Sequence, residues 1–228
     1  MEKMKTLYLM INLGTFLCAF FLSFDKKINY QKSWKSSFLS SVIIGIPFII
    51  WDIIFTKNKF WGFNEEYITE IYIYNLPIEE ILFFICIPFS CTFIYEVCKH
   101  YFKKLNMNNF NRVFYILIIL YSIFLIISEK GIGYYTLSVV ISSSLILLWL
   151  NFNNYYTYIP IAFFISIIPF LLVNGLLTGF FTEEPIVWYN ENQKINQRIF
   201  TIPIEDVLYS FTLIVSNIIV FEKLKKQF

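Results

Sequence analysis

The stretch NLPIEEILFF at residues 75–84 returns in closely similar form as TIPIEDVLYS at residues 201–210. In each copy a Pro-Ile pair is followed by two adjacent acids at the start of a run that is otherwise apolar. Proline and carboxylates in a first turn are typical of a helix start. Ionisable groups in a membrane-spanning run are also costly and mostly functional. Because the motif occurs twice, we expect the acidic pairs both to start helices and to carry chemistry.

The composition places the chain among multi-spanning membrane proteins. Of its 228 residues, 57% are hydrophobic, 21% are aromatic and only 15% are charged, and the mean hydropathy is +0.62. A soluble fold of this size does not cover so much apolar surface. The net charge of +2 is too small to favour nucleic acid as a partner.

Residues suited to metal ligation are few and scattered. A single histidine, His100, excludes a histidine-based metal cluster. The four cysteines fall in apolar runs without a CxxC or other metal-type spacing, and we expect them to be small buried side chains: Cys18, Cys86, Cys91 and Cys98. The sequence also lacks a Gly-rich phosphate-binding fingerprint. We therefore expect neither a metal nor a dinucleotide cofactor.

Seven runs are long and apolar enough to cross a hydrocarbon core of about 30 Å, which requires roughly 17–25 residues per helix. They lie at 7–24, 38–55, 78–98, 113–128, 134–150, 159–179 and 204–221. The first run follows lysines, as in a signal peptide, but no small-residue cleavage site follows Ser23, so we expect a retained helix. The sequence thus predicts an all-α membrane protein with seven transmembrane helices.

A gapless shift of 126 residues, the separation of Pro77 and Pro203, aligns the two halves of the chain. It also aligns residues upstream of the acidic motifs: Asn64 with Asn190, Glu65 with Glu191, and Ile73 with Ile199. A three-helix unit ends on the face opposite its start, so one extra helix lets two such repeats run parallel about an axis along the membrane normal. We expect a first repeat in 1–105, a joining helix in 106–132 and a second repeat in 133–228.

Lysine and arginine are unevenly divided between the two faces that this topology defines. One face carries seven of them, at the N-terminus and in the second, fourth and sixth connections, whereas the other carries eleven. The positive-inside tendency makes the second face cytoplasmic. We therefore expect the N-terminus and both acidic motifs near the outer face of the cell (inner) membrane.

The acidic pairs suit proton transfer to a substrate that has no polar handle. Two adjacent carboxylates in a desolvated site do not readily ionise together, so a protonated acid stands beside an ionised partner. An acid that protonates a carbon–carbon double bond, among aromatic faces that steady a cation, describes an isoprenoid cyclase. The chain offers such faces at Trp51, Trp61, Trp188, Tyr74, Phe83 and Tyr209. The candidate catalytic residues are Glu79, Glu80, Glu205 and Asp206.

Five further residues are candidates for binding or orienting a substrate. Asp52 is the only other acid well inside an apolar run, and a helix-end residue that faces water explains it equally well. Asn64 and Asn190 each lie 15 residues before the first acid of a motif, and we expect them to orient the carboxyls, with turn formation as the alternative. Trp61 and Trp188 stand near these asparagines and complete the set.

Taken together, these motifs resemble the lycopene cyclases of the heterodimeric type, in which two three-span subunits pair or are fused into one chain. The resemblance rests on LPIEE and IPIED, on WD at 51–52, WGFN at 61–64, WYN at 188–190 and LLVNGLLTG at 171–179. It covers nearly the whole chain and looks like the fused form. The family's Pro-x-Glu-(Glu/Asp) motif is intact in both copies, so the resemblance implies an active cyclase.

The resemblance implies a redox-neutral closure of the acyclic ends of lycopene. A protonated carboxyl adds a proton to the terminal double bond, the neighbouring double bond attacks the tertiary cation, and a carboxylate removes a proton from the ring. The implied enzyme is an intramolecular lyase or isomerase of the lycopene β-cyclase type that makes γ-carotene and β-carotene without a cofactor. Its implied partners are lycopene, the lipid bilayer and other carotenoid enzymes. Which carboxylate is the acid, and whether one ring or two form, stays open.

The main alternative is a membrane transporter that uses the paired intramembrane acids. Transporters more often show inverted repeats and glycine-interrupted helices, whereas this chain has only seven glycines. A retinal-based receptor requires a lysine in the last helix, and 207–221 contains none. A membrane prenyltransferase requires clustered aspartates, and the three aspartates here stand far apart.

Overall fold

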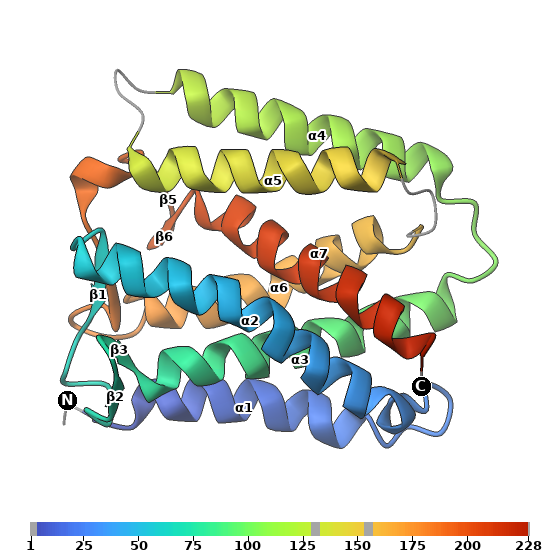
Figure 1. Ribbon diagram of the computed structural model, residues 1–228, viewed down its shortest axis with the longest axis horizontal. Coiled ribbons are helices and arrows are strands. Elements are labelled where there is room, and N and C mark those ends of the chain that lie inside the picture. Colours follow the sequence, from blue (N-terminus) through green and yellow to red (C-terminus); the bar gives the residue numbers. More distant parts are fainter. Residues whose placement is uncertain (1–3, 129–132, 153–156, 228) are drawn as a thin grey trace.

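The computed structural model describes residues 4–128, 133–152 and 157–227. Within these ranges the fold is all-helical: seven α-helices lie side by side, and three two-stranded ribbons gather at one end of the bundle (Figure 1). The helices are α1 (Leu7–Leu22), α2 (Trp34–Lys57), α3 (Ile78–Tyr101), α4 (Asn108–Ile127), α5 (Tyr134–Phe152), α6 (Ile159–Leu177) and α7 (Asp206–Lys225). A short 3-10 turn, Tyr30–Ser33, precedes α2. A second one, Glu191–Gln193, lies in the connection between α6 and α7.

Each of the seven predicted spans coincides with one of these helices, and the prediction of an all-α protein is confirmed. The helix α2 extends beyond its apolar run because polar end residues such as Lys35 and Lys57 continue the helical backbone. Among the described residues, five helices are long and apolar enough to cross a membrane, those that end at Lys57, Tyr101, Ile127, Leu177 and Lys225. Two further apolar helices are shorter than these five: Leu7–Leu22, which is α1, and Tyr134–Leu150, which lies within α5.

The six ribbon strands repeat along the chain at the same spacing as the acidic motifs. The strands β1 (Trp61–Phe63), β2 (Tyr72–Ile73) and β3 (Leu76–Pro77) return 126 residues later as β4 (Val187–Tyr189), β5 (Arg198–Ile199) and β6 (Ile202–Pro203). The pairs β2–β3 and β5–β6 are hairpins, and β1 pairs with β4 across the two halves.

Each hairpin turns at an exposed aromatic residue with left-handed backbone. Tyr74 and Phe200 are 126 residues apart and both have φ of 57°, a conformation that two-residue hairpin turns require. Each hairpin then ends in the proline of an acidic motif, Pro77 or Pro203, from which the chain passes into α3 or α7. The hairpins therefore deliver both acidic pairs to the same end of the bundle (Figure 1).

The helices α3 and α7 form the centre of the bundle. The helices α1 and α2 pack against α3, while α2 and α5 pack against α7, and α6 contacts both central helices. The contact faces bury large side chains completely, among them Phe84 and Phe89 on α3 and Phe211 and Phe221 on α7. The outer faces expose many large apolar residues, as on α4, which suits a lipid environment.

At the end of the bundle away from the ribbons, α3 and α7 exchange reciprocal ion pairs. Glu96 on α3 pairs with Lys225 on α7 at 2.6 Å, and Lys99 on α3 pairs with Glu222 on α7 at 2.6 Å. Glu96 and Glu222 are 126 residues apart, and so are Lys99 and Lys225. Glu96 thus contacts the counterpart of Lys99, and Lys99 contacts the counterpart of Glu96. Such reciprocal contacts are typical of an interface between two copies related by a two-fold axis.

Candidate active site

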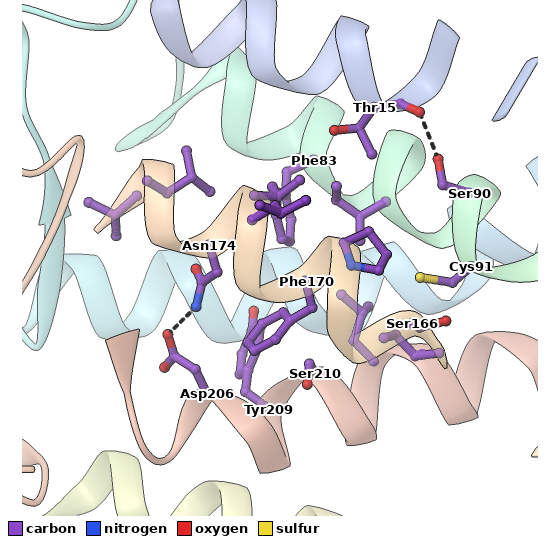
Figure 2. A pocket seen from close by; sticks show the side chains of 18 of the residues that line it. Thr15, Phe83, Ser90, Cys91, Ser166, Phe170, Asn174, Asp206, Tyr209 and Ser210 are labelled. Carbon is purple, nitrogen blue, oxygen red and sulfur yellow. Dashed lines mark hydrogen bonds between the residues drawn. The ribbon is translucent and has the colours of Figure 1, made fainter. Parts of the chain in front are cut away.

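A largely apolar cavity of about 460 Å³ lies between the central helices and the helices α1 and α6 (Figure 2). Its polar lining includes three carboxyls, from Asp52, Glu80 and Asp206, together with several phenols. A pocket that is mostly apolar and has a few convergent polar groups is typical of a small-molecule site. The three carboxyls are also buried, since none is more than 8% exposed.

The first carboxyl cluster joins α1, α2, α3 and α7. Glu80 begins α3 and accepts a hydrogen bond of 2.5 Å from the Tyr8 hydroxyl on α1. The Asp52 carboxyl on α2 shares a hydrogen bond with Glu80 and lies near the Tyr209 hydroxyl on α7. The second oxygen of Asp52, Oδ2, is buried and has no hydrogen-bond partner among the residues that the structure describes. Two carboxyls that share a hydrogen bond require a proton on one of them.

The second carboxyl cluster surrounds Asp206 at the start of α7. Its Oδ1 accepts a hydrogen bond of 2.5 Å from the Tyr135 hydroxyl on α5. Its Oδ2 accepts 2.7 Å from Asn174 Nδ2 on α6 (Figure 2) and 3.1 Å from the Tyr189 hydroxyl on β4. Every one of these partners donates, so the cluster favours an ionised carboxylate.

The two clusters lie close enough together to act on one substrate. Burial raises the pKa of Tyr189 well above its usual value, and the charges of Asp206, Glu80 and Asp52 raise it further. The Tyr189 phenol is thus close enough to carboxyls of both halves of the chain for each half to affect its pKa. Aromatic rings fill the space between the clusters: the Trp61 ring lies 5.2 Å from that of Tyr135, 6.2 Å from that of Tyr189 and 6.3 Å from that of Tyr209.

The first acid of each motif has a different environment from the second. Glu79 Oε1 accepts the backbone N–H of Thr69 at 2.7 Å, and Glu205 Oε1 accepts the backbone N–H of Ile195 at 2.5 Å. Thr69 and Ile195 are again 126 residues apart. Glu205 also accepts from the Thr136 hydroxyl. Neither Glu79 nor Glu205 lines the cavity; each holds the loop that leads into its own hairpin.

The remaining acid and tryptophan candidates divide between the cavity and the surface. Asp52 and Trp61 line the cavity. The alternative that Asp52 faces water does not hold, because its side chain is 1% exposed. Trp188 lies outside this cavity and is 39% exposed. Trp51 does not line the cavity, but its ring packs against that of Tyr209 at a centroid distance of 5.3 Å.

The two asparagines make turns. Asn64 Oδ1 accepts the backbone N–H of Glu66, and Asn190 Oδ1 accepts that of Asn192. Both side chains thus fit the alternative that sequence reasoning left open for them, turn formation. Among the described residues neither asparagine lines the cavity or hydrogen-bonds an acidic pair.

Sequence reasoning missed the four residues that hydrogen-bond the carboxyls of Glu80 and Asp206: Tyr8, Tyr135, Asn174 and Tyr189. Tyr8 and Tyr135 make equivalent contacts with Glu80 and Asp206. They are 127 residues apart, so an alignment of the two halves finds them only if it allows a gap of one residue. Asn174 and Tyr189 lie within quoted motifs but have no polar counterpart in the first half.

The cavity reaches the surface of the bundle between α1 and α6. Its lining there includes Gly14, Cys18 and Leu22 on α1 and Leu172 on α6, all of which are exposed. Apolar side chains such as Leu17 and Leu172 are exposed on these two helices, so the opening lies within an apolar surface. Among the described residues no group of three or more His, Cys, Asp or Glu side chains is arranged to hold a metal ion.

A comparison with protein families gives a match to the family model described as "Lycopene cyclase", over residues 5–98 and 132–224. The two matched segments are nearly equal in length, and each contains one acidic motif, which bears out the internal repeat. Neither the curated proteins nor the solved structures give a match.

Proposed function

The chain belongs to the lycopene cyclase family, and we propose that it closes the acyclic ends of lycopene into β-rings, giving γ-carotene and β-carotene. One observation carries this proposal above the others. Three buried carboxyls from the two halves of the chain converge on a single apolar cavity lined by aromatic rings. A hydrocarbon substrate fits the apolar lining, and proton transfer is the chemistry that the carboxyls offer.

The proposed reaction is an isomerisation of the intramolecular lyase type. A carboxyl O–H bond breaks as the terminal double bond of lycopene takes the proton and forms a C–H bond. The neighbouring double bond attacks the tertiary cation and closes a six-membered ring. A carboxylate then removes a ring proton, and the electrons of that C–H bond form the ring double bond. The faces of Trp61, Tyr135 and Tyr209 suit stabilisation of the cation.

We assign the four motif acids two kinds of role. Glu80 and Asp206 exchange protons with the substrate, and Asp52 acts together with Glu80. Glu79 and Glu205 position the loops and hairpins through the backbone N–H groups they accept. For these two residues the positioning role replaces the proton transfer expected from sequence alone.

We further propose that all seven helices cross the membrane as two parallel repeats, 1–105 and 133–228, joined by a helix in 106–132. The reciprocal ion pairs of α3 and α7 support a two-fold relation between the repeats. Two further contacts obey the same relation: Ser40 with Asn217, and Ser166 with Cys91. The N-terminus then lies on the non-cytoplasmic side of the cell membrane. A single cysteine at Lys27 should react with an impermeant reagent in inside-out vesicles and not in intact cells.

The transporter alternative is not favoured. The family match covers both halves of the chain, and Glu80 and Asp206 face one cavity lined largely by apolar residues, which offers little to a polar solute. Contact with other carotenoid enzymes remains part of the proposal, since the product must pass on through the bilayer.

Expression in a lycopene-accumulating bacterium tests the proposed function. Chromatography of the pigments should show conversion of lycopene to cyclic carotenes by the unaltered chain. The double variant Glu80→Gln, Asp206→Asn should leave lycopene unchanged, whereas Glu183→Gln, an exposed acid in the loop before β4, should convert it normally. Unchanged lycopene with the unaltered chain present in the membrane would overturn the proposal.

A further inference from the structure

We propose that the two halves of the site have opposite proton roles: the Asp52–Glu80 pair donates the proton that starts the reaction, and Asp206 removes the proton that ends it. This inference rests on the proposed cyclase function and adds a direction to it. The sequence leaves that direction open, because both motifs present two adjacent acids after Pro-Ile.

The donor side is defined by two carboxyls in contact. Asp52 and Glu80 come from different helices and are both buried, and they share a hydrogen bond. Two carboxylates this close in a desolvated site do not both ionise, so the pair holds a proton. Both residues also line the cavity. The pair therefore holds a proton beside the cavity, ready for transfer to a substrate. Asp52 Oδ2, which has no hydrogen-bond partner among the described residues, can take up part of the negative charge once that proton has left.

The acceptor side is defined by three donors around one carboxyl. Tyr135, Asn174 and Tyr189 all donate to Asp206, and within the described parts of the chain no other carboxyl hydrogen-bonds to it. Hydrogen bonds to the ionised form stabilise that form. Asp206 therefore enters the reaction as a base, and its charge also faces the cation that forms between the clusters.

The asymmetry arises at a few positions in an otherwise repeated frame. Tyr8 with Glu80 and Tyr135 with Asp206 are equivalent contacts, so the frame alone would make the halves alike. Four pairs of counterparts differ: Asp52 and Thr178, Phe48 and Asn174, Phe63 and Tyr189, Phe83 and Tyr209. Each difference adds a polar group beside one cluster: the Asp52 carboxyl and the Tyr209 hydroxyl beside Glu80, and Asn174 and Tyr189 beside Asp206.

The cycle closes when the proton returns from Asp206 to the Asp52–Glu80 pair. After ring closure the pair has lost one proton and Asp206 has gained one, so the substrate is isomerised without an oxidant or reductant. Tyr189 donates a hydrogen bond to Asp206, and the Tyr209 hydroxyl lies near Asp52. The rings of both tyrosines pack against Trp61 and Tyr135, at centroid distances of 5.9 to 6.3 Å. The two phenols thus lie between the clusters, each near a carboxyl that must exchange the returning proton.

Deuterium transfer tests the two roles separately. Membranes that contain each variant are incubated with lycopene in D₂O, and all recovered carotenoids are examined by mass spectrometry. Asp206→Asn should still protonate the substrate, so deuterium should appear in recovered lycopene or in rings with a displaced double bond. Asp52→Asn and Glu80→Gln should return unlabelled lycopene. Asp25→Asn, an exposed acid before α2, is the matched control and should behave as the unaltered chain does.

The outcomes distinguish this inference from the proposed function. If the unaltered chain forms no rings, the proposed function itself fails. If it forms rings but label appears with Asp52→Asn or Glu80→Gln, or is absent with Asp206→Asn, only the assignment of roles fails. Gel filtration in detergent identifies any variant that does not fold, and Glu80→Gln then serves in place of Asp52→Asn, or Asp206→Ser, which also lacks the carboxylate, in place of Asp206→Asn.

Discussion

Gly62 on β1 lies directly opposite Trp188 on β4, so the central pair of this ribbon consists of two residues that are each other's counterparts 126 positions apart. A side chain at Gly62 would meet the Trp188 ring, since a Cβ there would lie 2.4 Å from the nearest ring carbon. On either side, Trp61 faces Tyr189 and Phe63 faces Val187. At the opposite end of the bundle, the reciprocal ion pairs of α3 and α7 repeat this relation. The cavity lies between these two self-related contacts.

Replacing a cavity-facing acid should abolish cyclisation almost completely. Glu80→Gln and Asp206→Asn keep size and hydrogen bonding but cannot exchange a proton with carbon, and general acid–base groups contribute about 10²–10⁴-fold. Initial rates of ring formation in membranes measure the loss, with Glu183→Gln as the exposed control. Near-normal rates in both variants would remove these carboxyls from the mechanism.

Replacing a loop-holding acid should depend on whether the new residue can accept a hydrogen bond. Glu79→Gln keeps an acceptor for the Thr69 N–H and should retain most of the activity. Glu79→Leu leaves that partly buried N–H unpaired, which costs up to about 1–3 kcal/mol, and should lower both thermal stability and activity. If Glu79→Gln loses as much activity as Glu80→Gln, Glu79 takes part in proton transfer after all.

A large side chain at Gly14 should obstruct the opening between α1 and α6. A Cβ at Gly14 has no other atom within 4 Å, so Gly14→Trp should fold normally while its ring enters the cavity mouth. We expect cyclisation to fall at least tenfold. Leu13→Trp is the matched control, because Leu13 is exposed and does not line the cavity. Equal activity of the two variants would mean that the substrate enters by another route.

The two rings should form in separate binding events. Both carboxyl clusters line one cavity, so one end of the substrate reacts while the other end lies elsewhere. A time course should show γ-carotene rising before β-carotene, and excess fresh lycopene added early should delay the second ring. Bicyclic product at the earliest times, unaffected by added lycopene, would contradict a single shared site.

The ion pairs of α3 and α7 should show coupling in a double-mutant cycle. Glu96→Lys should lower thermal stability in detergent, and adding Lys225→Glu should restore part of it. The Lys225 side chain is 34% exposed, so we expect a coupling free energy of only about 1 kcal/mol. Lys99→Glu should likewise lower thermal stability, and adding Glu222→Lys should restore part of it. Strictly additive effects would show that the two pairs do not couple the repeats.

The sequence by itself determined the helical class, the seven apolar segments, the internal repeat and the family. These properties are local or periodic: hydrophobic runs are long enough to read directly, and a repeat appears wherever two motifs share a spacing. It also indicated that the paired acids are the centre of the chemistry. It did not separate Glu79 from Glu80, because adjacent positions of one motif look alike in a one-dimensional pattern.

Only the tertiary structure decided which acids meet. Adjacent residues at a helix start point in different directions, since successive positions on a helix are about 100° apart. Glu79 therefore turns toward the Thr69 loop, and Glu80 turns toward Tyr8 and Asp52. The pairing of Asp52 with Glu80 depends on the packing of α2 against α3, and the three donors to Asp206 come from α5, α6 and β4. Contacts between distant segments depend on packing geometry, which no spacing along the chain records.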